Sequence, residues 1–134
     1  MITMFIYYNP NPQGKKVGDC TVRAISNALQ KSWDETYMGL CMKGMELADM
    51  PSSNTVWGEY LKENGYVRKI IPTECPYCYT VQDFCRDHPT GVFLLSLNSH
   101  VVCVINGDWY DIWDSGEESP IFYWEYEGTE RKEE

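Results

Sequence analysis

The sequence predicts an α+β protein, because helical and β periodicities occupy different halves of the chain. Between Cys20 and Asn64, apolar residues recur every three or four positions, and capping patterns precede them. After Gly91 the pattern changes to short runs of β-branched and aromatic residues, separated by turn sequences such as Asn106-Gly107. We therefore expect N-terminal helices packed on a C-terminal antiparallel sheet.

The first half of the chain is expected to hold one short strand and three helices. Residues 5–8 are aromatic and β-prone, and prolines follow them. Asp19 is a suitable N-cap for a helix over 20–30. A capping box over 32–35 opens the second helix, and the third covers about 54–64 with Gly65 as its left-handed cap.

The second half is expected to be mostly strands. A capping pattern over 80–83 opens one short helix, which Pro89 and Gly91 end. Alternation and turn signals predict the strands, which cover residues 67–71, 92–97, 100–105, 108–113 and 121–126.

Length and charge limit the possible functions. A chain of 134 residues suits a single domain, which we expect over 1–127, with 128–134 as an acidic and polar disordered tail. A net charge of −9 argues against nucleic-acid or anionic-membrane partners. The N-terminal apolar run is short and lacks a basic region, so we expect a cytoplasmic protein with reduced thiols.

A cysteine and a histidine are placed as a nucleophile and its base would be. Cys20 falls in the first turn of the first helix, where unpaired amide groups and the helix dipole favour a thiolate. A thiolate nucleophile needs a base that is usually distant in sequence, and the chain has only two histidines. His100 opens a strand of the C-terminal hairpin, so we expect it to be the base.

The hairpin also indicates which acid holds the imidazole. If Asn106 and Gly107 form a two-residue turn, His100 lies opposite Trp113, beside Asp114. A three-residue turn would put Asp114 directly opposite His100. Asp111 lies two or three positions nearer the turn, so we expect Asp114 to orient His100, with Asp111 as the alternative.

These residues carry a resemblance to papain-like thiol hydrolases. The segment Gly18-Asp-Cys-Thr-Val-Arg-Ala-Ile25 is similar to the nucleophile segment of ovarian-tumour-type deubiquitinases, and the order Cys, His, Asp resembles C39-type peptidases. The resemblance implies a papain-like fold and a bacterial or phage origin. It also implies a cysteine peptidase or isopeptidase, with Cys20 attacking, His100 as base and then acid, and Asp114 orienting.

The resemblance leaves the oxyanion donor open. These families often carry a glutamine six residues before the nucleophile, where this chain has Gly14. An inserted residue would bring Gln13 or Asn11 to the same point, so we take Gln13 as the candidate donor beside the Cys20 amide.

Four other residues have the spacing of zinc ligands. Cys75, Cys78, Cys85 and His88 form a C-x2-C-x6-C-x2-H pattern. The tetrapeptide from Cys75 to Cys78 also resembles the dithiol of glutaredoxins, although too few α/β units follow it. The third interpretation, which we favour, is that Pro76 shapes a turn and the thiols neither bind a metal nor react. We therefore expect no cofactor.

Two classes of function therefore stay open. The first is a cysteine hydrolase that acts on a peptide or protein substrate. The second is a catalytically silent papain-fold module, with or without a stabilising zinc ion, that holds a protein partner. The incomplete oxyanion pattern favours this second class.

Overall fold

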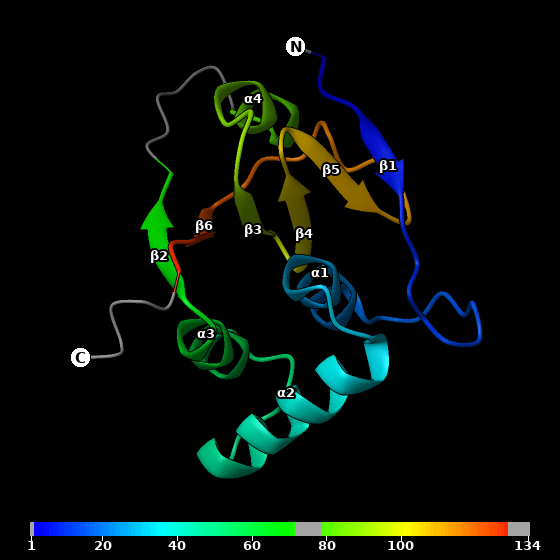
Figure 1. Cartoon of the computed structure of the whole chain (residues 1–134), viewed down its shortest axis with the longest axis vertical. Helices are drawn as coiled ribbons and strands as arrows, with labels where there is room; N and C mark the ends of the chain where they lie inside the picture. The colour runs from blue at the N-terminus through cyan, green and yellow to red at the C-terminus, as the bar shows by residue number, and fades with distance from the viewer. Residues whose placement is uncertain (1, 72–78, 129–134) are drawn as a thin grey trace.

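The computed structural model describes residues 2–71 and 79–128, which form an α+β fold with four helices and a six-stranded mixed sheet (Figure 1). The α+β class predicted from the sequence is confirmed. In chain order the elements are β1 (Phe5–Tyr7), α1 (Cys20–Leu29), α2 (Trp33–Leu47), α3 (Asn54–Glu63), β2 (Tyr66–Ile70), α4 (Val81–Asp87), β3 (Val92–Leu97), β4 (His100–Ile105), β5 (Asp108–Asp111) and β6 (Phe122–Tyr126).

The sheet has the order β1-β5-β4-β3-β6-β2 and is mixed, not purely antiparallel as expected. Four of the neighbouring pairs are antiparallel, but β1 lies parallel to β5, with Phe5 beside Trp109 and Tyr7 beside Asp111. Parallel pairing requires a crossover, and the chain between β1 and β5 supplies a long one. The strand from the start of the chain thus joins the hairpin strand that ends at Asp111.

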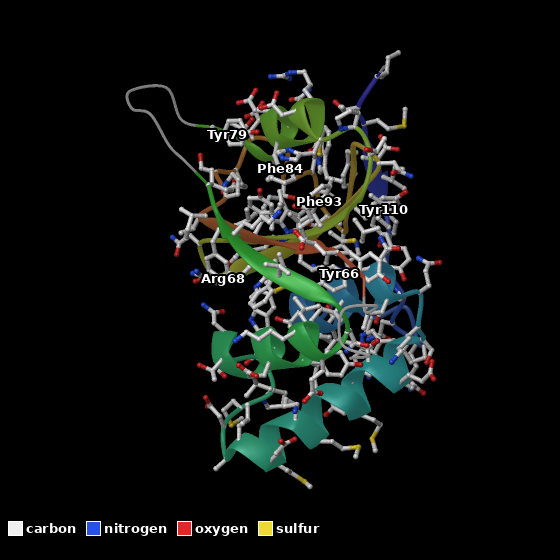
Figure 2. All side chains as sticks on the ribbon, turned by 60° about the vertical axis from the view of Figure 1, so that its left-hand side comes forward. Tyr66, Arg68, Tyr79, Phe84, Phe93 and Tyr110 are labelled. Atoms are coloured by element: carbon white, nitrogen blue, oxygen red, sulfur yellow. The ribbon has the colours of Figure 1, made fainter. Side chains whose placement is uncertain are left out.

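Helices cover both faces of the sheet, so each face has its own apolar core (Figure 1). On one face, Ile25 of α1 and Trp57 of α3 pack with Leu94 of β3. On the other face, Phe84 of α4 packs with Phe93 of β3, and Figure 2 shows both rings between α4 and the sheet. Alternate residues of the central strands supply the two cores, as the period of two in a strand requires.

Of the four helix caps predicted from the sequence, those at Ser32, Thr80 and Gly65 are confirmed and the one at Asp19 is not. Ser32 and Thr80 each complete a capping box, and Ser53 caps α3. Gly65 has the expected left-handed conformation, with φ 89°. Asp19 occupies the N-cap position of α1, but its side chain does not cap the helix.

Some element boundaries differ from the sequence prediction. β2 begins one residue early, and β5 ends at Asp111 instead of 113 because the chain turns away from the ladder there. Residues 129–134 of the expected tail lie outside the described residues. None of the helices in the described part of the chain is long and apolar enough to cross a membrane.

Candidate active site

The N-terminus of α1 meets the start of β4, and this contact brings Cys20 to His100. The Cys20 thiol is hydrogen-bonded to the His100 ring, and the Val101 amide donates a hydrogen bond to the sulfur. His100 follows the two-residue turn of the β3–β4 hairpin, in which Ser99 has a left-handed φ of 61°. The expected nucleophile and base therefore lie together.

Asp111, at the end of β5, is the acid that holds His100. The His100 Nε2 lies 2.7 Å from the Asp111 Oδ2, so the other ring nitrogen is left to face the thiol. Asp111 is almost fully buried, with 1% of its side chain exposed. It also accepts hydrogen bonds from the Ser115 hydroxyl at 2.8 Å and the Ile112 amide at 2.8 Å.

Asp114 does not contact His100, which corrects the expected assignment. Its Oδ1 accepts hydrogen bonds from the Trp109 indole and the Gly116 amide, both at 2.9 Å. The hairpin register is the two-residue one, with Ile105 opposite Asp108. Asp111, the last residue of β5, shares the face of His100 in that register, whereas Asp114 lies beyond the strand, where the chain has turned away from the ladder.

Arg23 is a site residue that sequence reasoning missed. Its guanidinium is buried and binds Asp111 Oδ1 at 3.1 Å through Nη2, and Asp19 Oδ1 through Nη1. Asp19 Oδ2 accepts a further hydrogen bond from the Trp33 indole at 2.8 Å. This explains why Asp19 does not cap α1: its carboxylate is committed to side chains. The i, i+4 spacing of Asp19 and Arg23 was the available signal.

The charges in this network shift the pKa values toward an ion pair. Burial raises the pKa of Cys20, but the His100 hydrogen bond and charge, the Val101 amide and the Arg23 charge outweigh it, so the pKa is lowered. Burial lowers the pKa of His100, but its bonds to Asp111 and Cys20 raise it to about 9. For Asp111, burial is outweighed by His100, Ser115 and the Ile112 amide, and its pKa is lowered.

The first turn of α1 leaves amide groups available beside the sulfur. The first intrahelical hydrogen bond runs from the Arg23 amide to the Asp19 carbonyl at 2.8 Å, and no side chain caps the helix. The amides of Cys20, Thr21 and Val22 thus have no partner within the helix. They can stabilise a thiolate or an oxyanion there.

Cys20 and His100 line a polar cleft of about 370 Å³. Ser52, Asn54 and Ser99 supply polar groups to it. Trp113 stands against His100, with ring centroids 5.0 Å apart. The cleft has room and hydrogen-bonding groups for a polar backbone segment next to the sulfur.

Gln13 is not among the cleft residues. It is exposed in a turn before α1, where its backbone amide donates to the Asn11 side chain at 2.9 Å. Asn11 also accepts from the Lys15 amide at 3.2 Å, so it shapes the turn and does not line the cleft. The expected glutamine donor is therefore missing from the site, because the loop closes on itself before it reaches the cleft.

The proposed zinc set is only half described, since Cys75 and Cys78 lie outside the described residues. Cys85, a residue of α4, is fully buried in the core, and burial raises its pKa to about 12. The His88 ring stacks on Phe84 and its Nδ1 lies 2.8 Å from the Phe84 carbonyl oxygen. Within residues 2–71 and 79–128, no group of three or more potential ligands could hold a metal ion.

The two remaining cysteines of the described residues differ in burial. Cys103 is fully buried among the apolar residues of β4 and its neighbours. Cys41 is only partly buried, and it lines a shallow pocket on α2. Both are free thiols.

Comparisons with protein-family models, curated proteins and solved structures found no match to this chain.

Proposed function

We propose that this chain is a papain-like cysteine hydrolase that cleaves peptide or isopeptide bonds. Cys20 is the nucleophile, His100 is the base and then the acid, and Asp111 orients the imidazole. The observation that carries the proposal is the continuous hydrogen-bonded series of these three side chains in an open cleft. The lowered pKa of Cys20 and the raised pKa of His100 are those that a nucleophilic ion pair requires.

The chemistry follows from the positions of the groups. The Cys20 thiolate attacks the carbonyl carbon, and a C–S bond forms with an oxyanion. The His100 imidazolium gives its proton to the leaving nitrogen as the C–N bond breaks. Neutral His100 then takes a proton from water, whose oxygen attacks the thioester. The C–S bond breaks, which releases a carboxylic acid and restores the ion pair.

The oxyanion needs donors other than Gln13. The Cys20 amide at the start of α1 is one. We assign the second to Asn54, at the start of α3, whose side chain lines the cleft. The Trp57 indole donates to Asn54 Oδ1 at 3.0 Å, which fixes the amide orientation and leaves its NH₂ group for the oxyanion.

Selective alkylation tests the nucleophile. Iodoacetamide near pH 6, followed by peptide mapping, should modify Cys20 ahead of Cys41, which is also partly exposed. Hydrolysis is then measured as new termini in a mixture of short peptides, with Cys20→Ser as the control. Labelling of Cys20 at the rate of Cys41 would overturn the proposal.

The alternative is a papain-fold module that binds a protein partner without turnover. The position of Gln13, outside the cleft, is the observation that favours it. Selective Cys20 labelling without any new termini in the peptide mixture would support this alternative over hydrolysis. A cytoplasmic, reducing location would suit either function, because both keep the thiols free.

A further inference from the structure

An apolar pocket adjoins the cleft at the N-terminal end of α1. It has a volume of about 300 Å³ and is lined by Trp33, Tyr37 and Leu40 of α2, with Pro51 and the start of α1 closing it. Gly18, Thr21 and Ser52 line both this pocket and the cleft, so the two lie next to each other.

The pocket is rigid and carries no free charge. The rings of Trp33 and Tyr37 stack with centroids 5.0 Å apart and planes 10° apart, and the Trp33 indole is tied to Asp19 at 2.8 Å. Asp19 is the one charged residue in the lining, and its carboxylate is already bound to Arg23 and Trp33. Such walls suit a large apolar side chain.

A second apolar hollow lies next to the first, further along α2. Pro51 lines both, and the second, of about 430 Å³, is bordered by Cys41, Met45 and Met50. Figure 2 shows sulfur-bearing side chains projecting from α2 into open space. Its one charged lining residue, Asp49, accepts hydrogen bonds from the Met50 amide at 2.7 Å and the Ser53 hydroxyl at 3.0 Å. We call the two hollows together the α2 channel.

The α2 channel follows one stripe of the helix. Tyr37, Leu40, Cys41, Gly44 and Met45 line it at positions i, i+3, i+4, i+7 and i+8. At 1.5 Å per residue the stripe is about 12 Å long, the length of roughly four residues of extended chain. Met45 is 79% exposed at the far end. Methionine side chains adapt to varied apolar partners.

The site chemistry decides which part of a substrate enters the channel. His100 must reach the leaving nitrogen, so the leaving group lies on the His100 side of the sulfur. His100 is on β4, on the sheet side of α1, whereas the α2 channel runs along α2, on the side of α1 that faces away from the sheet (Figure 1). The acyl portion of the substrate therefore faces the channel.

We propose that the α2 channel binds a run of large apolar side chains in the acyl portion of a polypeptide substrate, an inference that rests on the proposed function. The substrate is then a peptide or protein tail with about four apolar residues before the scissile bond. A bare isopeptide or a small amide would leave the channel unused.

Equilibrium binding to the Cys20→Ser chain tests the channel without any turnover. The probes are two fluorescent peptide amides of equal length, one with four consecutive leucines before a glycine and one with four serines there. We expect the leucine peptide to bind at least about tenfold more tightly. Met45→Glu should remove most of this preference. Met38→Glu is the matched control, since Met38 is 57% exposed on the same helix but outside both hollows.

Equal binding of the two peptides would overturn the inference, as would equal effects of the Met45 and Met38 substitutions. Light scattering at the same protein concentrations gives the remaining outcome. A dimer that Met45→Glu dissociates would assign the face to a second copy of the chain and overturn the substrate channel. The iodoacetamide rate at Cys20 reports on the proposed function separately, so the two failures are distinguishable.

Discussion

In the part of the chain that the structure describes, two cysteine–histidine neighbourhoods lie on opposite faces of one sheet, and their surroundings differ. Cys20 is partly exposed in a polar cleft, and its pKa is lowered by His100. Cys85 is a fully buried residue of α4, and burial raises its pKa. The His88 ring lies against the backbone carbonyl and the phenyl ring of Phe84. The same pair of residue types thus has the thiol pKa shifted in opposite directions, depending on the charge and solvent around it.

Removing each thiol in turn is expected to give the largest difference in effect between the two neighbourhoods. Cys20→Ala should abolish hydrolysis, because it removes the thiolate proposed to form the covalent intermediate. Cys85→Ala should retain hydrolysis and lose about 1 kcal/mol of stability from the small cavity left in the core. Peptide cleavage and urea unfolding measure the two effects. Residual cleavage by Cys20→Ala would assign the activity elsewhere.

Replacing the two nearby acids should give the next largest difference. Asp111→Asn removes the charge that holds the imidazolium, and kcat/KM should fall by about 10² to 10⁴. Asp114→Asn should leave kcat/KM within a few-fold, because Asp114 contacts Trp109 and Gly116 but not His100. The reverse order of effects would show that Asp114 is the orienting acid after all.

The two histidines should differ in their effect on thiol reactivity. In His100→Ala the Cys20 pKa should rise, because its hydrogen-bond partner and positive neighbour are lost. The iodoacetamide rate at pH 6 should then fall at least about tenfold, whereas His88→Ala should not change it. The iodoacetamide rate at Cys20, followed from pH 5 to 10, measures the Cys20 pKa in each of the two histidine variants. An unchanged rate profile in His100→Ala would contradict the assigned ion pair of Cys20 and His100.

The smallest expected effect is on how the free energy of unfolding depends on pH. The raised pKa of His100 gives stability that is complete below pH 6.5 and lost as the pH rises to about 9. The lowered pKa of Cys20 gives stability that increases as the pH rises toward 9.0. The two contributions oppose each other, so unfolding free energy should be nearly flat from pH 6.5 to 9.

Cys20→Ser removes one of these two contributions. Its unfolding free energy should then fall by about 1 kcal/mol over the same pH window, because the part of the His100 contribution that comes from Asp111 is left unopposed. Urea titrations at three pH values are sufficient to compare the slopes. A flat profile in Cys20→Ser would mean that the His100 pKa is not raised without the thiolate.

Much of this arrangement was predictable from the sequence. Cys20 and His100 followed from local patterns, a first helical turn and a strand start after a turn. The choice of Asp111 was also within reach, because the two-residue turn puts it on the face of the hairpin that His100 occupies.

Other features depend on contacts that local patterns do not contain. The parallel pairing of β1 with β5 joins residues about a hundred positions apart. Arg23 looked like one helical residue among others, and only the fold brings Asp111 to its guanidinium. The exposed position of Gln13 follows from hydrogen bonds within its own turn, which a count of residues from the nucleophile does not represent.

The buried guanidinium of Arg23 also constrains how this site can evolve. From Asp19 through Arg23, Asp111 and His100 to Cys20, neighbouring groups alternate in sign when the ion pair is formed. Losing Arg23 alone would leave the buried carboxylates of Asp19 and Asp111 with no positive charge between them. Divergent relatives are therefore expected to exchange Asp19 and Arg23 together, as a covarying pair, while the three reacting positions stay fixed.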